Sequence, residues 1–327
     1  MGPQQDFAIS MQHFWSQAGA FVSFMGDDAG FYWLAAAYFF MIAAERIGYF
    51  LFKRGAYDDK DALNNIVING IDYAFDFLIS NFAPMVLYVW VYDHWRLIGP
   101  LPFVAAIPLA FVAHEICYYI DHRIGHRVGL FWAFHQVHHS SNEFNFTVAP
   151  RGFLIDGNIV LFLCAVPFAF VGLPPAVFLG MHALKSIYGI FNHADYIPKM
   201  GILEEFIATP SNHRAHHGVQ AKYIDKNYSQ VTVILDRLLG TFQKEEERAI
   251  VGLITPYYDK HPIRTELAGL VWMRDRINSA PRWQDKWKYL WMPPEWTHDG
   301  RTLALSRDHV QTADAANADA ETVEAAE

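Results

Sequence analysis

Cysteine is nearly absent from this chain of 327 residues, which contains only Cys117 and Cys164. Both lie within apolar stretches, so the sequence predicts neither a disulfide framework nor a thiolate metal site. Charged residues are also few, at 18%, whereas 53% of the residues are hydrophobic and 16% are aromatic. This composition favours a membrane protein with a large polar part. The net charge of -9 does not indicate a nucleic-acid partner, and we expect none.

Several common catalytic and cofactor motifs are missing as well. The chain has no GxSxG elbow and no P-loop, which argues against a serine hydrolase and a nucleoside triphosphatase. It also has no dinucleotide fingerprint and no CxxCH haem motif, so any electrons that it uses must come from elsewhere. We expect no signal peptide, because the amino terminus lacks a basic segment and a small-residue cleavage pattern.

Histidine is abundant, and eight of the sixteen histidines fall into three clusters of similar spacing. The clusters are His122 and His126; His135, His138 and His139; and His213, His216 and His217. Residues three and four apart share one helix face, so each cluster can direct its imidazoles at one point. A closed structural site needs only four ligands, so eight converging imidazoles predict two metal ions. The isolated histidines, to which we assign no role, are His13, His94, His261, His298 and His309.

Three further histidines differ in how well their positions suit a metal site. His193 follows an apolar hairpin at its polar end, which makes it a plausible ninth ligand. His114 lies about two helical turns before His122 and is a weaker candidate, whereas His182 lies inside the hairpin. Acidic residues near the motifs could offset the charge of the ions from outside the ligand set. These candidates are Glu115, Asp121, Glu143, Asp195 and Asp225.

Four apolar stretches predict an all-α integral membrane bundle with about four to five embedded helices. They cover residues 31–52, 77–92, 101–120 and 159–191. A membrane-spanning helix needs about 20 mostly apolar residues, which the third stretch supplies. The fourth contains Gly172-Leu-Pro-Pro175, so we expect a hairpin of two short helices over 159–171 and 176–191.

The distribution of basic residues predicts the orientation in the membrane. Residues 1–30 contain no Lys or Arg, whereas the first connection contains Lys53, Arg54 and Lys60. Because cytoplasmic loops are rich in Lys and Arg, we expect an external amino terminus and three crossings before the first histidine cluster. The hairpin then returns the chain to the cytoplasmic side, where all three clusters can meet.

The predicted organisation is a short extracytoplasmic segment, one membrane domain and a disordered tail. The segments are 1–29, 30–305 and 306–327, with the cytoplasmic metal-binding cap mainly in 121–157 and 192–305. The tail is acidic, rich in Ala and without a large apolar face. Before it, Trp283, Trp287 and Trp291 have a spacing of four and share a helix face, with Trp296 following. That face suits either a membrane interface or packing against the polar domain.

The residues around the histidines extend these motifs. They include Tyr118-Tyr-Ile-Asp-His122-Arg, Phe131-Trp-Ala-Phe-His135, Asn145-Phe-Thr147-Val-Ala-Pro-Arg151, Thr209-Pro-Ser-Asn-His213 and Asp225-Lys-Asn-Tyr228. The chain resembles the fatty acid hydroxylase and sterol desaturase superfamily of membrane di-iron enzymes, and most resembles its alkylglycerol monooxygenase-like branch. Two positions depart from that branch: Arg127 replaces an acidic residue, and Gly152 replaces a glutamine.

The resemblance implies that the eight clustered histidines and His193 hold two iron ions that use O2 to hydroxylate a lipid C–H bond. The lipid would be of the alkylglycerol, sterol or acyl type. The electron donor would be a separate reductase or ferredoxin, or a reduced pterin. Asn145, Arg151, Asn227 and Tyr228 would order the site or contact a head group, unless they serve only as capping and packing residues. The alternatives are a desaturase of the same superfamily and a non-catalytic metal-binding or transport protein.

Overall fold

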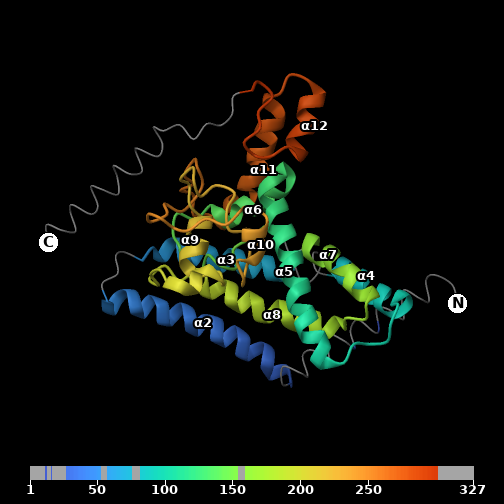
Figure 1. Cartoon of the computed structure of the whole chain (residues 1–327). Coiled ribbons are helices and arrows are strands. Elements are labelled where there is room, and N and C mark those ends of the chain that lie inside the picture. Colours follow the sequence, from blue (N-terminus) through green and yellow to red (C-terminus); the bar gives the residue numbers. More distant parts are fainter. Residues whose placement is uncertain are drawn as a thin grey trace.

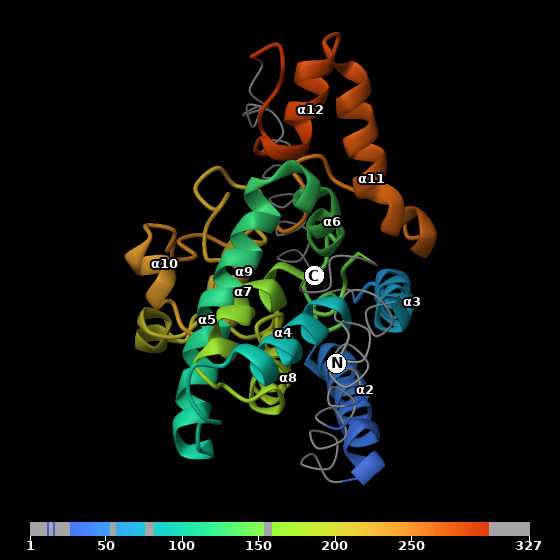
Figure 2. The ribbon, with the colours of Figure 1, turned by 90° about the vertical axis from the view of Figure 1, so that its right-hand side faces the viewer.

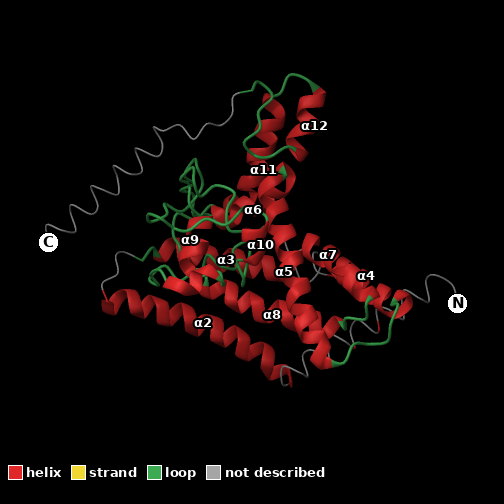
Figure 3. Ribbon diagram, in the orientation of Figure 1, coloured by secondary structure: helices red, strands yellow, loops and turns green. Residues whose placement is uncertain are grey.

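The computed structural model describes residues 27–52, 57–75, 82–153 and 159–300, together with Gln12 and Ser16. Within these residues the regular structure is helical, and the β pairing consists of two isolated bridges, Ile207 with Thr232 and Gly218 with Val251 (Figure 3). The predicted all-α class is therefore confirmed. Most of the predicted extracytoplasmic segment 1–29 and the whole of the predicted tail 306–327 lie outside the described residues.

The apolar stretches form helices close to the predicted positions (Figure 1). They correspond to α2 (Asp27–Phe52), α4 (Phe82–Trp95), α5 (Phe103–Arg127), α7 (Ile159–Phe170) and α8 (Pro175–Phe191). The break between α7 and α8 falls at Gly172, which has a φ of 78°. A side chain there would come within 2.6 Å of the Gly99 carbonyl oxygen, so the turn needs glycine for both reasons.

Four of these helices enclose the main apolar core, because α4, α5, α7 and α8 pack against one another. On α5 the residues facing this core are small: Ala106, Ala110, Ala113 and Cys117 are fully buried. Their spacing of three and four places them on one face, where small side chains let neighbouring helices approach closely. The core also contains Tyr88, whose hydroxyl donates to the Leu173 carbonyl at 2.9 Å.

Among the described residues, α5 is the one helix that is both long and apolar enough to cross a membrane. Its outward side carries Val104, Val112, Ile116 and Ile120, all of them exposed. Steps of eight and four residues keep these side chains on one stripe. Beside this stripe on the helix surface, a buried ion pair joins Glu115 to Lys185 of α8 at 2.7 Å, because a charge inside an apolar bundle needs a partner.

The polar part of the fold was less evident from the sequence. It contains α3 (Asp59–Phe75), α6 (Gly129–His139), η2 (Gly201–Glu205), α9 (Pro210–His216), α10 (Ile234–Leu238), α11 (Pro262–Ser279) and α12 (Trp283–Trp291). Figure 2 shows α11 and α12 beyond the carboxyl end of α5, with α6 beside α11. Helix α3 is not predicted by the sequence, whose polar residues there indicate a connection.

The tryptophan face of α12 is exposed to its surroundings. The exposed fractions of Trp283, Trp287 and Trp291 are 72%, 59% and 51%. Packing of this face against the polar domain, one of the two alternatives, is therefore wrong for these three residues. Trp296 differs, since its ring packs against that of Tyr289 with centroids 4.9 Å apart. Location of the face at a membrane interface stays a prediction.

Gly269 allows α11 to lie directly on α6, because a Cβ at this position would come within 1.6 Å of the Ala133 carbonyl oxygen. We expect Gly269→Ala to separate the two helices and to lower the free energy of unfolding by about 1–3 kcal/mol. The matched control is Gly70→Ala on α3, where a Cβ would meet nothing within 4 Å. Thermal unfolding of the detergent-solubilised protein checks this, and equal stability of the two variants would contradict it.

Candidate metal centre

The structure brings the eight clustered histidines and His193 together in two groups, each able to hold a metal ion. The first group contains His122, His126, His135, His139 and His216, and the second contains His138, His193, His213 and His217. Within each group the potential ligand atoms lie within 4.8 Å of one another. The two groups adjoin, since the rings of His139 and His217 stack with centroids 4.2 Å apart.

Helical geometry explains how the sequence motifs divide between the groups. Histidines four apart stay together: His135 joins His139 in the first group, and His213 joins His217 in the second. The middle histidine of each HxxHH motif, His138 or His216, joins the opposite group. A residue and its direct neighbour differ in direction by about 100° on a helix, so adjacent imidazoles can serve different ions. The sequence predicted two ions but not this exchange of ligands.

Local sequence features fix the helices that carry these side chains. Helix α9 begins with Thr209, whose side chain accepts a hydrogen bond from the Asn212 backbone in a reciprocal capping box, and such caps stabilise a helix start by about 1 kcal/mol. Arg214 on the same helix forms a buried ion pair with Glu245 at 2.6 Å. On α5, a Cβ at Gly125 would come within 3.2 Å of the His135 ring, so glycine gives that ligand room.

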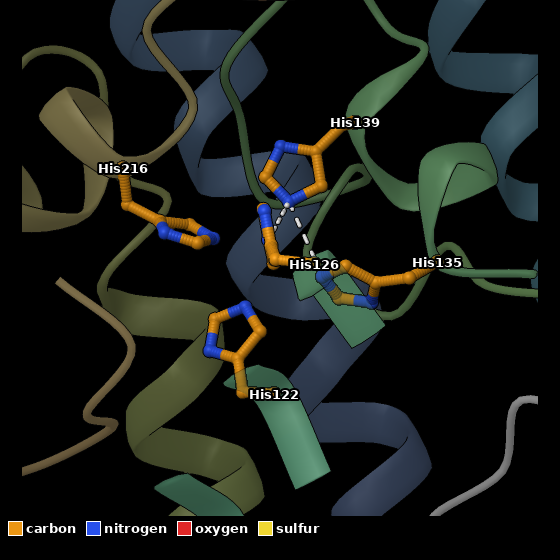
Figure 4. Close-up of side chains that lie close together, drawn as sticks. All are labelled: His122, His126, His135, His139 and His216. Atoms are coloured by element: carbon orange, nitrogen blue, oxygen red, sulfur yellow. Dashed lines mark hydrogen bonds between the residues drawn. The ribbon is translucent and has the colours of Figure 1, made fainter. Parts of the chain in front are cut away.

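Inside each group the inward nitrogens approach one another closely, and Figure 4 shows this for the first group. In the first group, His139 Nε2 lies 3.1 Å from His126 Nε2 and 3.2 Å from His135 Nε2. In the second, His213 Nε2 lies 3.1 Å from His193 Nε2 and 3.2 Å from His217 Nε2. Nitrogens that bind one ion at about 2.0–2.1 Å are themselves a little over 3 Å apart. The spacing therefore fits a shared ion.

The outward nitrogens of four histidines are fixed by backbone carbonyls. His122 Nδ1 donates to the Tyr228 carbonyl and His216 Nδ1 to the Lys226 carbonyl, each at 2.7 Å. In the second group, Nδ1 of His138 donates to the Arg151 carbonyl at 3.0 Å, and Nδ1 of His193 to that of Gly189 at 2.9 Å. A carbonyl can only accept, so Nδ1 carries the proton and Nε2 keeps its lone pair for a metal.

Two buried imidazole nitrogens without hydrogen-bond partners, together with the lowered pKa values of several histidines, support metal binding. Nε2 of His122 and of His216 is buried without a hydrogen-bond partner, a costly arrangement unless another group satisfies the atom. Burial lowers the pKa of His216 to about 3 and that of His193 to about 4. Burial, with nearby imidazoles, also lowers the pKa of His139 well below its usual range. Neutral imidazoles of this kind bind divalent transition metals.

One short segment, Asp225–Tyr228, supports three histidines of the first group. Besides its two carbonyl contacts, it places Asp225 Oδ1 3.8 Å from His126 Nδ1. Asp225 and Asn227 have φ values of 58° and 57°, the only positive values among described residues other than glycine. The Asn227 side chain donates to the carbonyls of Asn212 and Gln243 at 2.9 and 2.7 Å. These bonds hold a backbone that non-glycine residues rarely adopt.

Arg127 connects the first group to a distant segment of the chain, a contact that the sequence does not predict. Its guanidinium donates to Asp225 in a very short contact and to Glu295 Oε1 at 2.9 Å. It therefore ties the segment after α12 to the carboxylate beside His126. The only signal in the sequence was its departure from the acidic residue of the resembling branch, and spacing gives no indication of its distant partners.

The second group depends on a different support, centred on Arg151. Its carbonyl orients His138, while its guanidinium donates to the Val137 carbonyl at 2.8 Å and to Asn65 Oδ1 at 2.6 Å. Asn65 lies on α3, which thus braces α6 from outside. Asn145 is more distant from the ligands, because its side-chain oxygen accepts from the backbone and hydroxyl of Thr147.

The other acidic residues that were predicted to lie just outside the ligand set make contacts elsewhere. Glu115 accepts from Lys185 and Thr232, and Asp195 forms an ion pair with Arg248. Asp121 accepts from the Leu161 backbone at 3.2 Å and lines a small cavity next to His135. Burial raises the pKa of Glu143 to about 7, and the Glu143 backbone donates to Ser141 Oγ at 3.1 Å.

His114 is not a member of either group of histidines. Its Nε2 lies 3.0 Å from His182 Nδ1, and its ring stacks on that of Tyr118. It thus pairs with the histidine of the apolar hairpin instead of approaching the site. The prediction that His114 is a possible metal ligand is therefore wrong.

Comparison with known proteins agrees with this geometry. The family model described as fatty acid hydroxylase matches residues 107–241, a range that contains all nine grouped histidines. Residues 107–241 form a fatty acid hydroxylase domain. The predicted membership of the fatty acid hydroxylase superfamily is confirmed.

Two kinds of curated relative match this chain. Alkylglycerol monooxygenases of Xenopus tropicalis and Homo sapiens are 32% and 31% identical over 223 residues, which are 68% of this chain and 49% of each relative. Ornithine lipid hydroxylase OlsE of Rhizobium tropici is 32% identical over 150 residues, which are 46% of this chain and 44% of that protein. The chain spans about half the length of these relatives. No solved structure matches it.

Substitution of one histidine from each group separates the two sites. We expect His216→Ala to reduce metal at the first group and His138→Ala at the second, because each removes an inward ligand that the remaining rings cannot replace. Elemental analysis of the purified protein measures the metal lost from each variant. His298→Ala is the control, since His298 bonds Tyr289 Oη outside the groups; equal metal loss in this control would count against the assignment.

Asn227→Ala tests the support of the first group. Loss of its side-chain contacts frees the strained Asp225–Tyr228 segment, and we expect the affinity of the first group for metal to fall by about 10–100-fold. The second group, which this segment does not contact through its backbone carbonyls, should keep its metal. Competition with a chelator measures both affinities. The control is Asn142→Ala, whose side chain donates to the Tyr257 carbonyl; a similar loss there would reject the specific role.

Proposed function

We propose that this chain is an integral membrane oxygenase that uses two iron ions and O2 to hydroxylate a lipid C–H bond. The observation that carries the proposal is the pair of adjoining, all-histidine groups inside a fatty acid hydroxylase domain. The two groups have neutral imidazoles as their ligands, and the nearest carboxylate contact is that of Asp225 with His126. Hydrolytic two-metal sites usually contain bridging carboxylates, so this ligand set supports redox-active iron and oxygen activation instead.

In the proposed reaction, one oxygen atom of O2 enters the lipid C–H bond as a hydroxyl group and the other leaves as water. This balance requires two electrons and two protons from outside. Iron held by both groups would supply the oxygen activation, while the protein holds the imidazoles neutral and directed inward. We propose a separate reductase or ferredoxin, or a reduced pterin, as the electron donor.

A cavity of about 20 Å³ supports an approach to the first group from the side of α7. It is lined by Asp121, Gly125, Phe131, Phe134, His135, Ile159 and Val160. Most of these side chains are apolar, and one is a candidate ligand. The cavity is large enough for a molecule of the size of water or O2, and the apolar start of α7 lies at its edge. Such surroundings suit the approach of a hydrocarbon chain.

The names of the relatives suggest the class of substrate. One set acts on alkylglycerols and another on ornithine lipids, so we propose a lipid with a polar head group and a long chain as substrate. A desaturase of the same superfamily is the nearest variant, since it would use the same ions, O2 and electrons.

The proposed location is a multi-pass position in a membrane, with the histidine groups on the cytoplasmic side. The apolar α5 ends in His122 and His126, and the hairpin of α7 and α8 ends just before His193, so both deliver ligands to one side. A non-catalytic transport protein is less well supported, because a transport path would distribute its ligands along the spans. Here the nine histidines converge at the end of them.

Lipid profiling under isotopically labelled O2 tests the proposed function. Cells that produce the protein should contain a lipid with one added labelled oxygen atom, and the His138→Ala variant should not produce it. The purified protein should contain iron at both groups. Stoichiometric zinc, with no oxygen consumption on any lipid extract, would defeat the proposal. A product that has lost two hydrogens without gaining oxygen would identify the desaturase variant.

A further inference from the structure

Six large apolar side chains are exposed together on two short elements of the polar part. On and beside η2 they are Ile202, Leu203 and Phe206, and on and beside α10 they are Ile234, Leu238 and Leu239. The most exposed are Leu238 at 74% and Ile202 at 71%. We call these six residues the η2–α10 surface. Single exposed apolar residues are ordinary, whereas a group of this size calls for a partner.

Backbone and side-chain bonds hold the two elements side by side. The Ala208 backbone donates to the Val231 carbonyl at 2.9 Å, and that of Val233 donates to the Phe206 carbonyl at 3.1 Å. Arg237 also donates to the Glu205 carbonyl at 3.0 Å. Since both elements are anchored, the six side chains form one preformed surface and not two independent loops.

The η2–α10 surface adjoins the outward side of the candidate membrane span. Helix α10 packs against α5, as Figure 2 shows. Just before α10, the Thr232 backbone donates to Glu115 of α5 at 2.8 Å. The next residue on α5 is Ile116, which belongs to the exposed apolar stripe. The η2–α10 surface therefore continues the exposed apolar stripe of α5.

Charges at the rim of the surface complement anionic lipids. Two cations, Arg237 and Lys244, both pair with the single carboxylate of Glu205 in very short contacts. Arg237 and Lys244 together exceed the charge of Glu205 by one, and Lys199 nearby donates to the Glu246 carbonyl. Basic residues beside an apolar surface are typical of protein segments that lie on anionic membrane leaflets.

We infer that the η2–α10 surface lies in the interfacial region of the same bilayer that α5 spans, with its six apolar side chains among phospholipid acyl chains. The continuity with the stripe on α5 identifies the bilayer as the occupant. A soluble protein partner would have to contact α5 as well, where lipid already covers the stripe.

This placement would connect the bilayer to the first histidine group through few bonds. In α10, the Asp236 carboxylate accepts from the Tyr228 and Ser229 backbones, each at 2.9 Å. Tyr228 in turn orients His122. From the other element, the chain leaves η2 and enters the cap of α9 at Thr209. The surface would thus set the height of the metal centre above the acyl chains.

Spin labels in lipid nanodiscs test the inference without any measurement of turnover. Labels at Leu238→Cys and Phe206→Cys are placed in a Cys117→Ala/Cys164→Ala background, in discs of phosphatidylcholine and phosphatidylglycerol. The matched control is Glu246→Cys, a comparably exposed side chain (63%) on a polar loop. Metal content and thermal unfolding of each variant verify that it is folded.

We expect the ratio of oxygen to nickel-chelate accessibility to be several-fold higher at residues 238 and 206 than at 246, because oxygen partitions into acyl chains and the chelate stays in water. Equal ratios at all three positions would place the surface in water and overturn the inference. Exclusion of both reagents would also overturn it, since this would mean that a second copy or another protein covers the surface. Neither result would affect the proposed reaction.

Discussion

The whole polar part of this fold depends on the need to satisfy both nitrogens of buried, neutral imidazoles. For four of the nine, a backbone carbonyl accepts the Nδ1 proton, which leaves Nε2 free to point inward. Free backbone carbonyls occur in irregular segments and in the last turn of a helix, as at Gly189 of α8. The irregular segment with left-handed Asp225 and Asn227 supplies the acceptors for His122 and His216. Because these acceptors are part of the backbone, the loops that carry them must be as well defined as the helices.

Two kinds of structure position the histidines: apolar helices and buried polar side chains. Apolar helices, above all α5 and the α7–α8 hairpin, fix where the first histidines and His193 emerge. Buried polar side chains then fix how the loops lie against them, with Arg151, Arg214 and Asn227 each making several contacts. Loss of one such group leaves its partners buried and unpaired, which costs more than an ordinary surface contact. The centre is therefore sensitive to residues that touch no ligand.

The sequence was sufficient for the features that follow from local periodicity. Apolar blocks located α2, α4, α5, α7 and α8, and histidine spacing located eight of the nine members of the two groups. The ninth, His193, was predicted from its position at the end of the apolar hairpin. It was insufficient for contacts between distant segments. The partners of Arg127 are 98 and 168 residues away, and no spacing rule connects them. Helix α3 was missed because its polar asparagines and aspartates, which are buried against Thr147 and Arg151, resemble those of a loop.

The exchange of ligands between the two groups has a mechanical consequence. His138 and His139 are consecutive on α6 yet belong to different groups, and the same is true of His216 and His217 at the end of α9. Any rotation of α6 about its axis would carry the two imidazoles sideways together, toward one ion and away from the other. Consecutive residues of a helix differ by about 1.5 Å in rise and about 100° in direction, and this fixed geometry would keep ions held by the two groups at a constant separation when the surrounding loops move.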